Sequence, residues 1–270
     1  MYALDFEYDK RTLSDYGFIV CDFNSPSGAD VVDVGCDVTF NTVPMHRGKK
    51  RATVSTSYEE CLRATIHICK NPDETKDMCI TRDEYRDLVR WLCREEYLPF
   101  RIIYADDFEC ETCYFDASFH VNRIEINKIL YGLELTIETN CPFGYGVEQR
   151  KRLEFSEGDL KKKMHDNSDV IGSIYPDMTI TCLSDGDLSL RNETLGLTML
   201  LKNCVNGEVI TIHGEPQIIL SSVDSHKVYD DFNFQFFKIG NTFYNNLNTI
   251  TASIPCIADI RYRPTIFSAP

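Results

Sequence analysis

The sequence lacks the features that mark membrane, secreted and nucleic-acid-binding proteins. None of its hydrophobic runs reaches the roughly 18 apolar residues that a transmembrane helix needs. The opening stretch MYALDFEYDKRTL has no basic segment followed by an apolar core, so we expect synthesis in the cytoplasm without an export signal. Positive charge is scarce: 28 Lys and Arg stand against 42 Asp and Glu, a net charge of −14. This balance disfavours binding to a phosphate backbone.

Motifs for metal binding and catalysis are also missing. The twelve cysteines are scattered, and only Cys110 and Cys113 form a C-x-x-C pair, whereas a structural zinc site needs a second pair. We expect reduced thiols and no cofactor. The six histidines occur outside any HExxH or GxSxG context, so we expect no enzyme activity. Asp185 and Asp187 in the segment SDGD offer calcium ligands, but further ligands are lacking and a plain turn is favoured.

The sequence is rich in the two-residue alternation of half-buried β-strands. The pattern is clearest over ILYGLELTIET at 129–139, and β-branched and aromatic segments continue it at 2–8, 51–58 and 61–70. These segments predict a mostly β first half.

One segment changes this period. In ITRDEYRDLVRWLCREEYLPF, apolar residues recur every three or four positions, as on one face of a helix. Thr81 and Glu84 predict a capping box at its start, and Pro99 prevents its continuation. We predict one helix that covers a sheet through Tyr85, Leu88, Val89, Trp91 and Leu92, with Trp91, the only tryptophan, just off the main apolar stripe.

The strand pattern ends in the segment TIETNCPFGYG. We interpret its last six residues as a domain boundary, at which the last strand of the first domain leaves its sheet; they are Cys141, Pro142, Phe143, Gly144, Tyr145 and Gly146. The polar segment that follows has no sustained period and suits a connector with at most a short helix. We therefore expect a first domain at 1–150, a connector at 151–172 and a second domain at 173–270.

Short strands resume in the second domain. MTITCLSDGDLSLRN predicts a hairpin around SDGD, and LGLTMLLKNCVNGEVITIHG predicts another with a type I′ turn at Asn206-Gly207. PQIILSS, NFQFFKI and NTITASIPCIADIRYRP add further strands. Many short strands at this spacing favour a β-sandwich or jelly roll.

One basic run, RGKKR, lies between two strand-like segments of the first domain. The simpler interpretation is a solvated hairpin loop. The alternative is a docking site for an acidic partner, formed by Arg47, Lys49, Lys50 and Arg51.

Several segments together resemble the distal tail (Dit-like) proteins of long-tailed, siphovirus-type bacteriophages. They are FEYDKRTLSDYGFIVCDF, YLPFRIIY after the helix, YGLELTIETNCPFGYG, NGEVITIHG, GEPQIILSS, FYNNLNTITAS and IADIRYRP, in this order along nearly the whole chain. The resemblance implies a β-barrel-like or split-barrel N-terminal domain with one packed helix, and a galectin-like C-terminal β-sandwich. It further implies a hexameric ring at the tip of the phage tail, built from the first domain.

The resemblance also implies partners and a location. Such a ring joins the tail tube protein to the tail hub protein, and its second domain holds receptor-binding proteins or contacts host glycans. DNA passes through the ring without specific binding, no membrane insertion is involved, and the protein is assembled in the host cytoplasm into the virion.

Two alternatives remain. The first is the equivalent ring protein of a contractile phage-like particle. The second is a carbohydrate-binding module for host adhesion, with candidate aromatic residues Tyr229, Phe232, Phe234, Phe236, Phe237, Phe243 and Tyr244.

Overall fold

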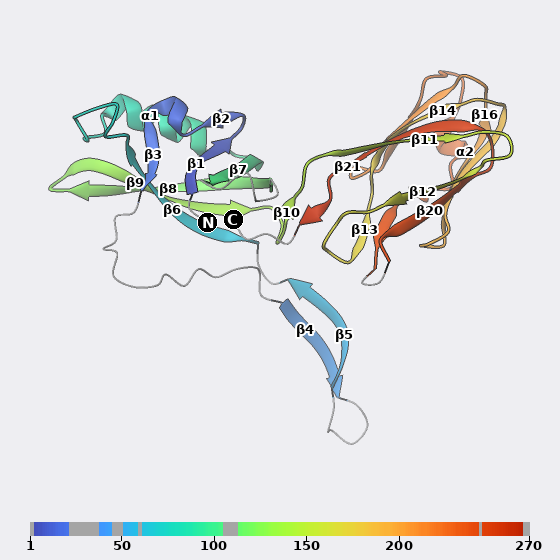
Figure 1. Ribbon diagram of the computed structural model, residues 1–270, viewed down its shortest axis with the longest axis horizontal. Helices are drawn as coiled ribbons and strands as arrows, with labels where there is room; N and C mark the ends of the chain where they lie inside the picture. Colours follow the sequence, from blue (N-terminus) through green and yellow to red (C-terminus); the bar gives the residue numbers. More distant parts are fainter. Residues whose placement is uncertain are drawn as a thin grey trace. The chain divides into compact units, whose positions relative to one another are not determined.

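The computed structural model describes residues 3–21, 38–44, 51–58, 61–104, 113–242 and 245–266. The chain divides into two units, one built from Met1–Gly146 and the other from Val147–Ile266. Strands dominate both units, and the described residues contain two α-helices (Figure 1). The predicted mainly β fold is confirmed.

An antiparallel sheet of seven strands organises the first unit, in the order β2-β1-β7-β8-β9-β6-β3. Its strands are β1 (Ala3–Tyr8), β2 (Arg11–Thr12), β3 (Phe18–Cys21), β6 (Arg63–Lys70), β7 (Leu98–Tyr104), β8 (Phe115–Ile126) and β9 (Ile129–Thr139). The end strands β2 and β3 do not pair with each other, so the described strands form an open sheet. The first domain, expected to be barrel-like or a split barrel, is therefore not a closed barrel in its described strands, because a barrel closes only when its edge strands pair.

The longest pairing in this sheet is the β8–β9 hairpin. Its two turn residues, Asn127 and Lys128, have φ values of 57° and 67°. Positive φ at both central residues is the geometry of a type I′ turn, whose twist matches that of the flanking strands. A short 3₁₀ helix, η1 (Ser14–Tyr16), links β2 to β3.

The predicted helix is present as α1 (Arg82–Leu92), and it lies across the sheet in Figure 1. Both reciprocal bonds of the capping box form: the backbone N–H of Glu84 donates to the Thr81 hydroxyl, and that of Thr81 donates to the Glu84 carboxylate. Leu88, Trp91 and Leu92 are buried. Trp91 thus belongs to the buried face instead of lying beside it.

Two further strands of the first unit, β4 (Val38–Pro44) and β5 (Arg51–Tyr58), pair only with each other among the described residues. They form an antiparallel ladder from Val38 opposite Tyr58 to Pro44 opposite Arg51. Residues 45–50, which hold most of the basic run, lie outside the described residues.

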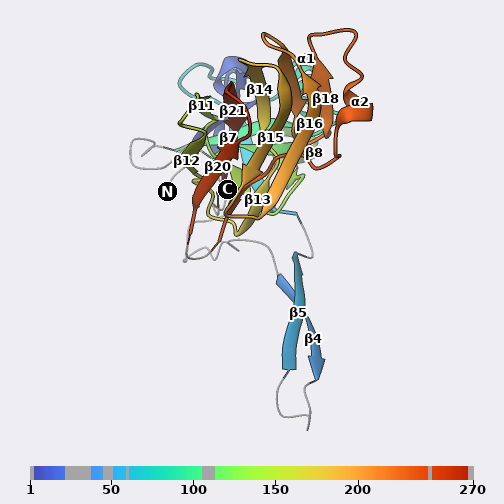
Figure 2. The same cartoon turned by 90° about the vertical axis from the view of Figure 1, so that its right-hand side faces the viewer.

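Two sheets make the second unit, in the orders β11-β21-β14-β17-β18 and β12-β20-β15-β16. Their strands are β11 (Gln149–Phe155), β12 (Lys161–His165), β14 (Asp177–Cys182), β15 (Gly186–Asn192), β16 (Leu197–Cys204), β17 (Val209–His213), β18 (Ile218–Ser221), β20 (Leu247–Ala252) and β21 (Cys256–Tyr262). Strands β15 and β16 run side by side in Figure 2. The chain crosses between the two sheets after β11, β12, β14, β16, β18 and β20, which is a jelly roll.

The crossings correct two predictions. β14 and β15 flank SDGD but belong to different sheets, as do β16 and β17 on either side of Asn206-Gly207, so neither pair is a hairpin. In the second turn Glu208 N–H donates to Val205 O (3.1 Å) and only Gly207 has positive φ, at 84°. This is type II geometry instead of type I′. Turn residues alone do not show whether the next strand pairs with the last.

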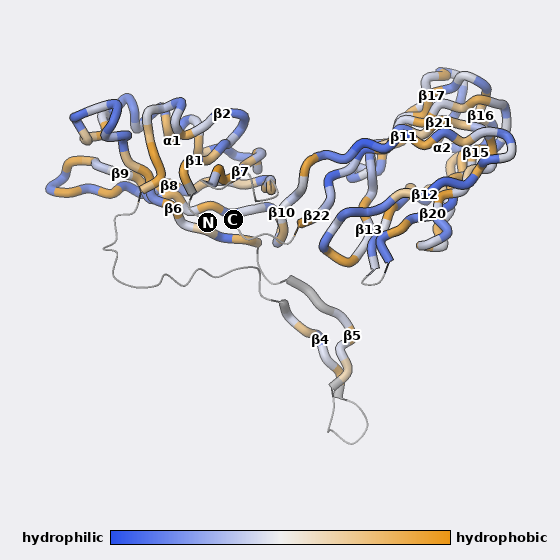
Figure 3. The backbone as a smooth tube through the Cα atoms, in the orientation of Figure 1, coloured by the Kyte–Doolittle hydropathy of each residue, from blue (hydrophilic) through white to orange (hydrophobic). Residues whose placement is uncertain are grey.

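The expected connector at 151–172 is also wrong. It contains most of β11, all of β12 and the start of β13 (Gly172–Ile174). β11 and β12 are the edge strands of the two sheets, and Leu153, Phe155 and Met164 are buried in the core. Because an edge strand tolerates charge on its outer side, the polar composition concealed the strands; β11 is drawn largely in hydrophilic colours in Figure 3.

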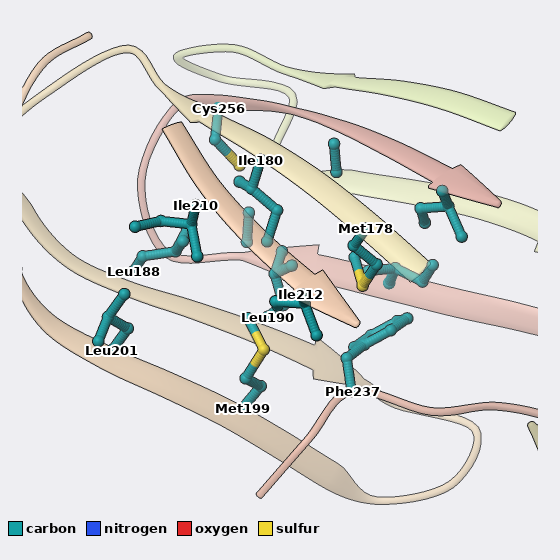
Figure 4. Close-up of a cluster of buried hydrophobic side chains, with 14 of the residues drawn as sticks. Met178, Ile180, Leu188, Leu190, Met199, Leu201, Ile210, Ile212, Phe237 and Cys256 are labelled. Atoms are coloured by element: carbon teal, nitrogen blue, oxygen red, sulfur yellow. The ribbon is translucent and has the colours of Figure 1, made fainter. Parts of the chain in front are cut away.

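Alternate apolar side chains fill the space between the two sheets (Figure 4). The predicted strand NFQFFKI does not form before its last residue, Ile239, but its segment contributes to this core: Phe237 and the preceding Phe232 are buried, whereas Phe234 is 66% exposed with a φ of 55°. It lies between α2 (Val228–Asp231) and β19 (Ile239–Asn241), which pairs with β13. A short strand, β22 (Thr265–Ile266), ends the described chain.

Candidate functional site

The boundary segment folds back onto the first unit. Gly144 and Tyr145 form β10, and Tyr145 exchanges two backbone hydrogen bonds with Tyr114, at 2.8 and 2.7 Å. The hydroxyl of Thr139, the last residue of β9, donates to Cys141 O at 2.7 Å. The segment is thereby pinned beside the start of β8 after the long strand ends.

Gly144 is required by close packing. A Cβ atom at this position would lie 2.0 Å from Cys113 Sγ and 3.1 Å from the Phe115 ring. The Cys141 thiol further fixes the turn by donating to Phe143 O at 2.9 Å. Phe143 and Tyr145 meet edge to face, with ring centroids 6.4 Å apart. These contacts give the segment a structural role within its own unit; Pro142 lies between Cys141 and Phe143, and Gly146 follows Tyr145.

The helix residues form an aromatic core. Trp91 Nε1 donates to Tyr8 O at 3.0 Å, and its ring stacks on Phe6 and Tyr16 at centroid distances of 5.6 and 4.6 Å. Tyr85 is half-buried beneath the Arg123 guanidinium, 4.6 Å from its ring centroid.

Val89 is half-buried at the margin of this core. At the start of the helix, the buried Lys70 pairs with Glu84 at 2.8 Å. The Glu84 carboxylate therefore pairs with Lys70 of β6 and also accepts from Thr81 at the helix N-cap.

The β4–β5 hairpin exposes apolar side chains that the sequence did not mark as a surface. Phe40 is 62% and Val54 is 68% exposed, and Val43 is also exposed. β-branched and aromatic residues predicted the second of these strands, but not that the apolar side chains described on the pair would be exposed. Arg47, Lys49 and Lys50 lie outside the described residues, as does the side chain of Arg51, which begins β5.

The acidic turn SDGD lies where the chain crosses from β14 to β15, that is, from one sheet to the other. Asp185 Oδ1 accepts from the backbone N–H of Asn206 (2.7 Å), and Asp187 Oδ1 accepts from that of Asn203 (3.1 Å). The Asp185 carboxylate therefore links the β14–β15 crossing to the β16–β17 crossing, and the Asp187 carboxylate bonds β15 to β16. In the described part of the chain no three His, Cys, Asp or Glu side chains are grouped to hold a metal ion.

A buried ionisable cluster in the second unit was not predicted. The Glu208 side chain is fully buried and accepts from the Ser221 hydroxyl (2.5 Å), His226 Nδ1 (2.5 Å) and the backbone N–H of Val205 (2.9 Å). Burial opposes its charge, but the bonds from Ser221 and His226 outweigh burial and lower the pKa of Glu208. Burial likewise opposes a charged His226, yet Glu208 outweighs it and raises the pKa of the imidazole.

Two cavities of about 430 Å³ each flank the segment 223–231 that carries this histidine. The His226 side chain is 5% exposed and lines both cavities. Its Nε2 lies 3.5 Å from Asp231 Oδ2 but has no hydrogen-bond partner among the described residues. The sequence gives no sign of this site, because the glutamate and histidine are 18 residues apart and meet only through the fold.

The candidate aromatic residues of the second unit separate into two groups. Tyr229 is 54% exposed and lines one of these cavities, and Phe234 is exposed elsewhere. Phe232, Phe236 and Phe237 pack in or against the core. Phe243 and Tyr244 lie outside the described residues. Within the described ranges neither helix is long and apolar enough to cross a membrane.

Comparisons with known proteins agree with this two-unit organisation. Residues 1–141 match a family described as "Phage tail protein N-terminal domain", and residues 143–262 match a "Phage tail C-terminal domain". No curated protein matches.

Among solved structures, the crystal structure of the phage SPP1 Dit protein is similar with a TM-score of 0.64 and 11% identity, over 96% of this chain and 98% of that one. That protein is described as a paradigm of the hub adsorption apparatus in phages infecting Gram-positive bacteria. The predicted resemblance is confirmed: the chain belongs to the phage tail proteins and has a Dit-like fold.

Proposed function

We propose that this protein is a structural component of the distal tail, which forms a hexameric ring between the tail tube and the tail hub. The observation that carries the proposal is the likeness to SPP1 Dit along nearly the whole of both chains, in a member of a phage tail family. The role is structural: the protein holds other virion proteins in fixed positions, without a catalytic step.

The first unit supplies surfaces suited to ring formation. A ring arises when two different patches of one chain meet around a closed rotation. The open sheet ends at β2 and β3, and edge strands readily pair with another chain. The β4–β5 hairpin adds exposed apolar area of the kind that interfaces cover.

The proposal assigns the basic run at Arg47, Lys49, Lys50 and Arg51 to contact with an acidic neighbour in the tail. The jelly roll projects as a peripheral, galectin-like domain that carries receptor-binding proteins. The protein is then part of the virion at the tail tip, assembled in the host cytoplasm.

Sedimentation velocity and negative-stain imaging of the purified full chain test the proposal. We expect six-fold rings, either alone or after mixing with the tail tube and tail hub proteins of the same phage. A chain that stays monomeric alone and in the presence of both partners would contradict it.

A further inference from the structure

Among the described residues three cysteines are buried, and all three lie in the core of the second unit. Cys182 ends β14 and Cys256 begins β21, and these strands are neighbours in the five-stranded sheet. Cys204 ends β16, which belongs to the other sheet. The backbone register therefore places only Cys182 and Cys256 relative to each other, and the scaffold role gives their thiols no task.

Cys182 and Cys256 lie directly opposite each other in the antiparallel ladder. Leu183 N–H donates to Pro255 O (2.9 Å), whereas Cys182 N–H turns away from Cys256 and donates to Glu208 O (2.9 Å). The two cysteines are thus a non-hydrogen-bonded pair, in which facing Cα atoms are about 4.5 Å apart. This separation falls within the range of about 4.4–6.8 Å that a disulfide bond spans.

The two side chains also point in the same direction. Residues that face each other across two strands share one face of the sheet, and here both residues are fully buried. Figure 4 shows Cys256 among the buried side chains between the two sheets. Rotation about the Cα–Cβ bonds can therefore bring the two sulfur atoms together without moving the strands.

The place of the pair in the ladder gives an oxidant a way in. Burial raises the pKa of the Cys256 thiol to about 12, so the closed core holds little of the reactive thiolate. The pair is, however, the last of the β14–β21 ladder, and the next residue, Leu183, is exposed. Strand ends open locally at a lower cost in free energy than the whole unit. Opening of this one end exposes both thiols.

We propose that Cys182 and Cys256 stay reduced during assembly and form a disulfide bond after the particle leaves the host, which locks β14 to β21. The oxidant is a low-molecular-weight disulfide such as oxidised glutathione. One cysteine thiolate attacks it, forms a mixed disulfide and releases one glutathione. The second thiolate then attacks the cysteine sulfur of the mixed disulfide and releases the other. Two protein thiols are oxidised, and their protons pass to the two glutathione thiolates.

The bond stabilises the second unit because it joins residues that are far apart in the sequence and so restricts the unfolded chain. The cytoplasm keeps thiols reduced, whereas the medium outside the cell permits disulfides. Only this timing rests on the proposed function as a virion protein. The bond itself depends on the second unit alone.

Peptide mapping by mass spectrometry tests the proposal on the purified full chain. The chain is incubated with oxidised glutathione, or with reduced glutathione as a control, then alkylated under denaturing conditions and digested without reductant. We expect a linked peptide pair that contains Cys182 and Cys256 only after oxidation. It should form faster in sub-denaturing urea, which favours local opening. Oxidation should also raise the midpoint of thermal unfolding of the second unit by several degrees.

Cys204→Ala is the matched control, since it removes a buried cysteine of the same core from the other sheet. This variant should retain the linked pair and the thermal shift, and Cys256→Ala should lose both. Absence of the linked pair even in urea would overturn the proposal. So would a bond from Cys204 to either cysteine in its place, or a linked pair that leaves the thermal midpoint unchanged. None of these outcomes bears on ring assembly, so the distal-tail function is judged separately.

Discussion

Gly144 shows how far single residues could be understood from the sequence. Its position in a Pro-Phe-Gly-Tyr-Gly segment marked the end of a strand, and the segment does follow β9 directly. The sequence did not show why glycine is needed here. The reason is that Cys113 Sγ, from a different part of the chain, leaves no room for a Cβ atom. Distant contacts of this kind leave no local pattern.

Replacing Gly144 should therefore destabilise the first unit by overpacking. We expect Gly144→Ala to lower the free energy of unfolding by about 1–3 kcal/mol, as measured by urea denaturation. Cys113→Ala in the same chain removes the sulfur that the new Cβ would strike, and it should restore part of the loss. A fully additive double variant would contradict this steric explanation.

The Glu208–His226 pair should make the stability of the second unit depend on pH. The pKa of His226 is raised above its ordinary 6.5, so its contribution is complete below that value and disappears as the pH rises through the folded-state pKa. The pKa of Glu208 is lowered below its ordinary 4.5, so its contribution is complete above that value and disappears as the pH falls through the folded-state pKa.

Both contributions are therefore complete between about pH 4.5 and 6.5. Besides Glu208, Asp231 also faces the histidine and favours its charged form. Urea unfolding followed across pH 4 to 9 should show the loss of stability above this window for the native chain. His226→Gln should remove that upper dependence, and an unchanged profile would contradict the assignment.

At the scale of elements, the helix was the best predicted part of the chain. Its capping box, its start and the burial of Leu88 and Leu92 follow from local sequence, and α1 has all three, although Trp91 also belongs to the buried face. Strands were recognised by alternation, but pairing was not: SDGD and Asn206-Gly207 looked like hairpin turns and are sheet crossings. Pairing depends on which sheet the next strand joins, and contacts between residues far apart in the sequence determine that.

The helix should be held by burial more than by intrinsic propensity. Leu88 is fully buried in the aromatic core, so Leu88→Ala should cost about 2–5 kcal/mol of unfolding free energy. Arg86→Ala, an exposed change on the same helix, should stay within about 0.5 kcal/mol. Chemical denaturation of both variants gives the comparison, and similar costs would mean that burial does not distinguish the two faces.

At the scale of the whole molecule, the sequence suggested two domains joined by a connector at 151–172. This segment instead consists largely of strands of the second unit. Edge strands β11 and β12 carry so many Lys, Arg and Glu residues that composition alone placed them outside any core. Each nonetheless buries alternate apolar residues, including Phe155 and Met164. Sparse alternation within charged sequence is the signal that could have identified them.

The location of these edges predicts which fragments fold. A fragment of residues 147–270 contains every strand of both jelly-roll sheets and should unfold cooperatively in thermal denaturation. A fragment of residues 173–270 lacks β11 and β12 and exposes the core beneath them, so it should aggregate or unfold without cooperativity. Equal stability of the two fragments would contradict the assignment of the edges.

The net charge of the chain predicts how the proposed ring treats DNA. Six copies carry 6 × −14 = −84 formal charges. A channel lined with Lys and Arg would hold the genome by its phosphates, whereas neutral or acidic walls leave it free to pass. We therefore expect the lumen-facing loops of the first unit to be acidic or neutral, with the basic run Arg47–Arg51 directed towards a neighbouring protein.

Purified rings should not shift a DNA duplex in gel electrophoresis at physiological salt. The triple variant Arg47→Glu, Lys49→Glu, Lys50→Glu should weaken tail assembly but should also leave the DNA duplex unshifted. Retention of DNA by the native ring, abolished in the variant, would instead place the basic run in the channel.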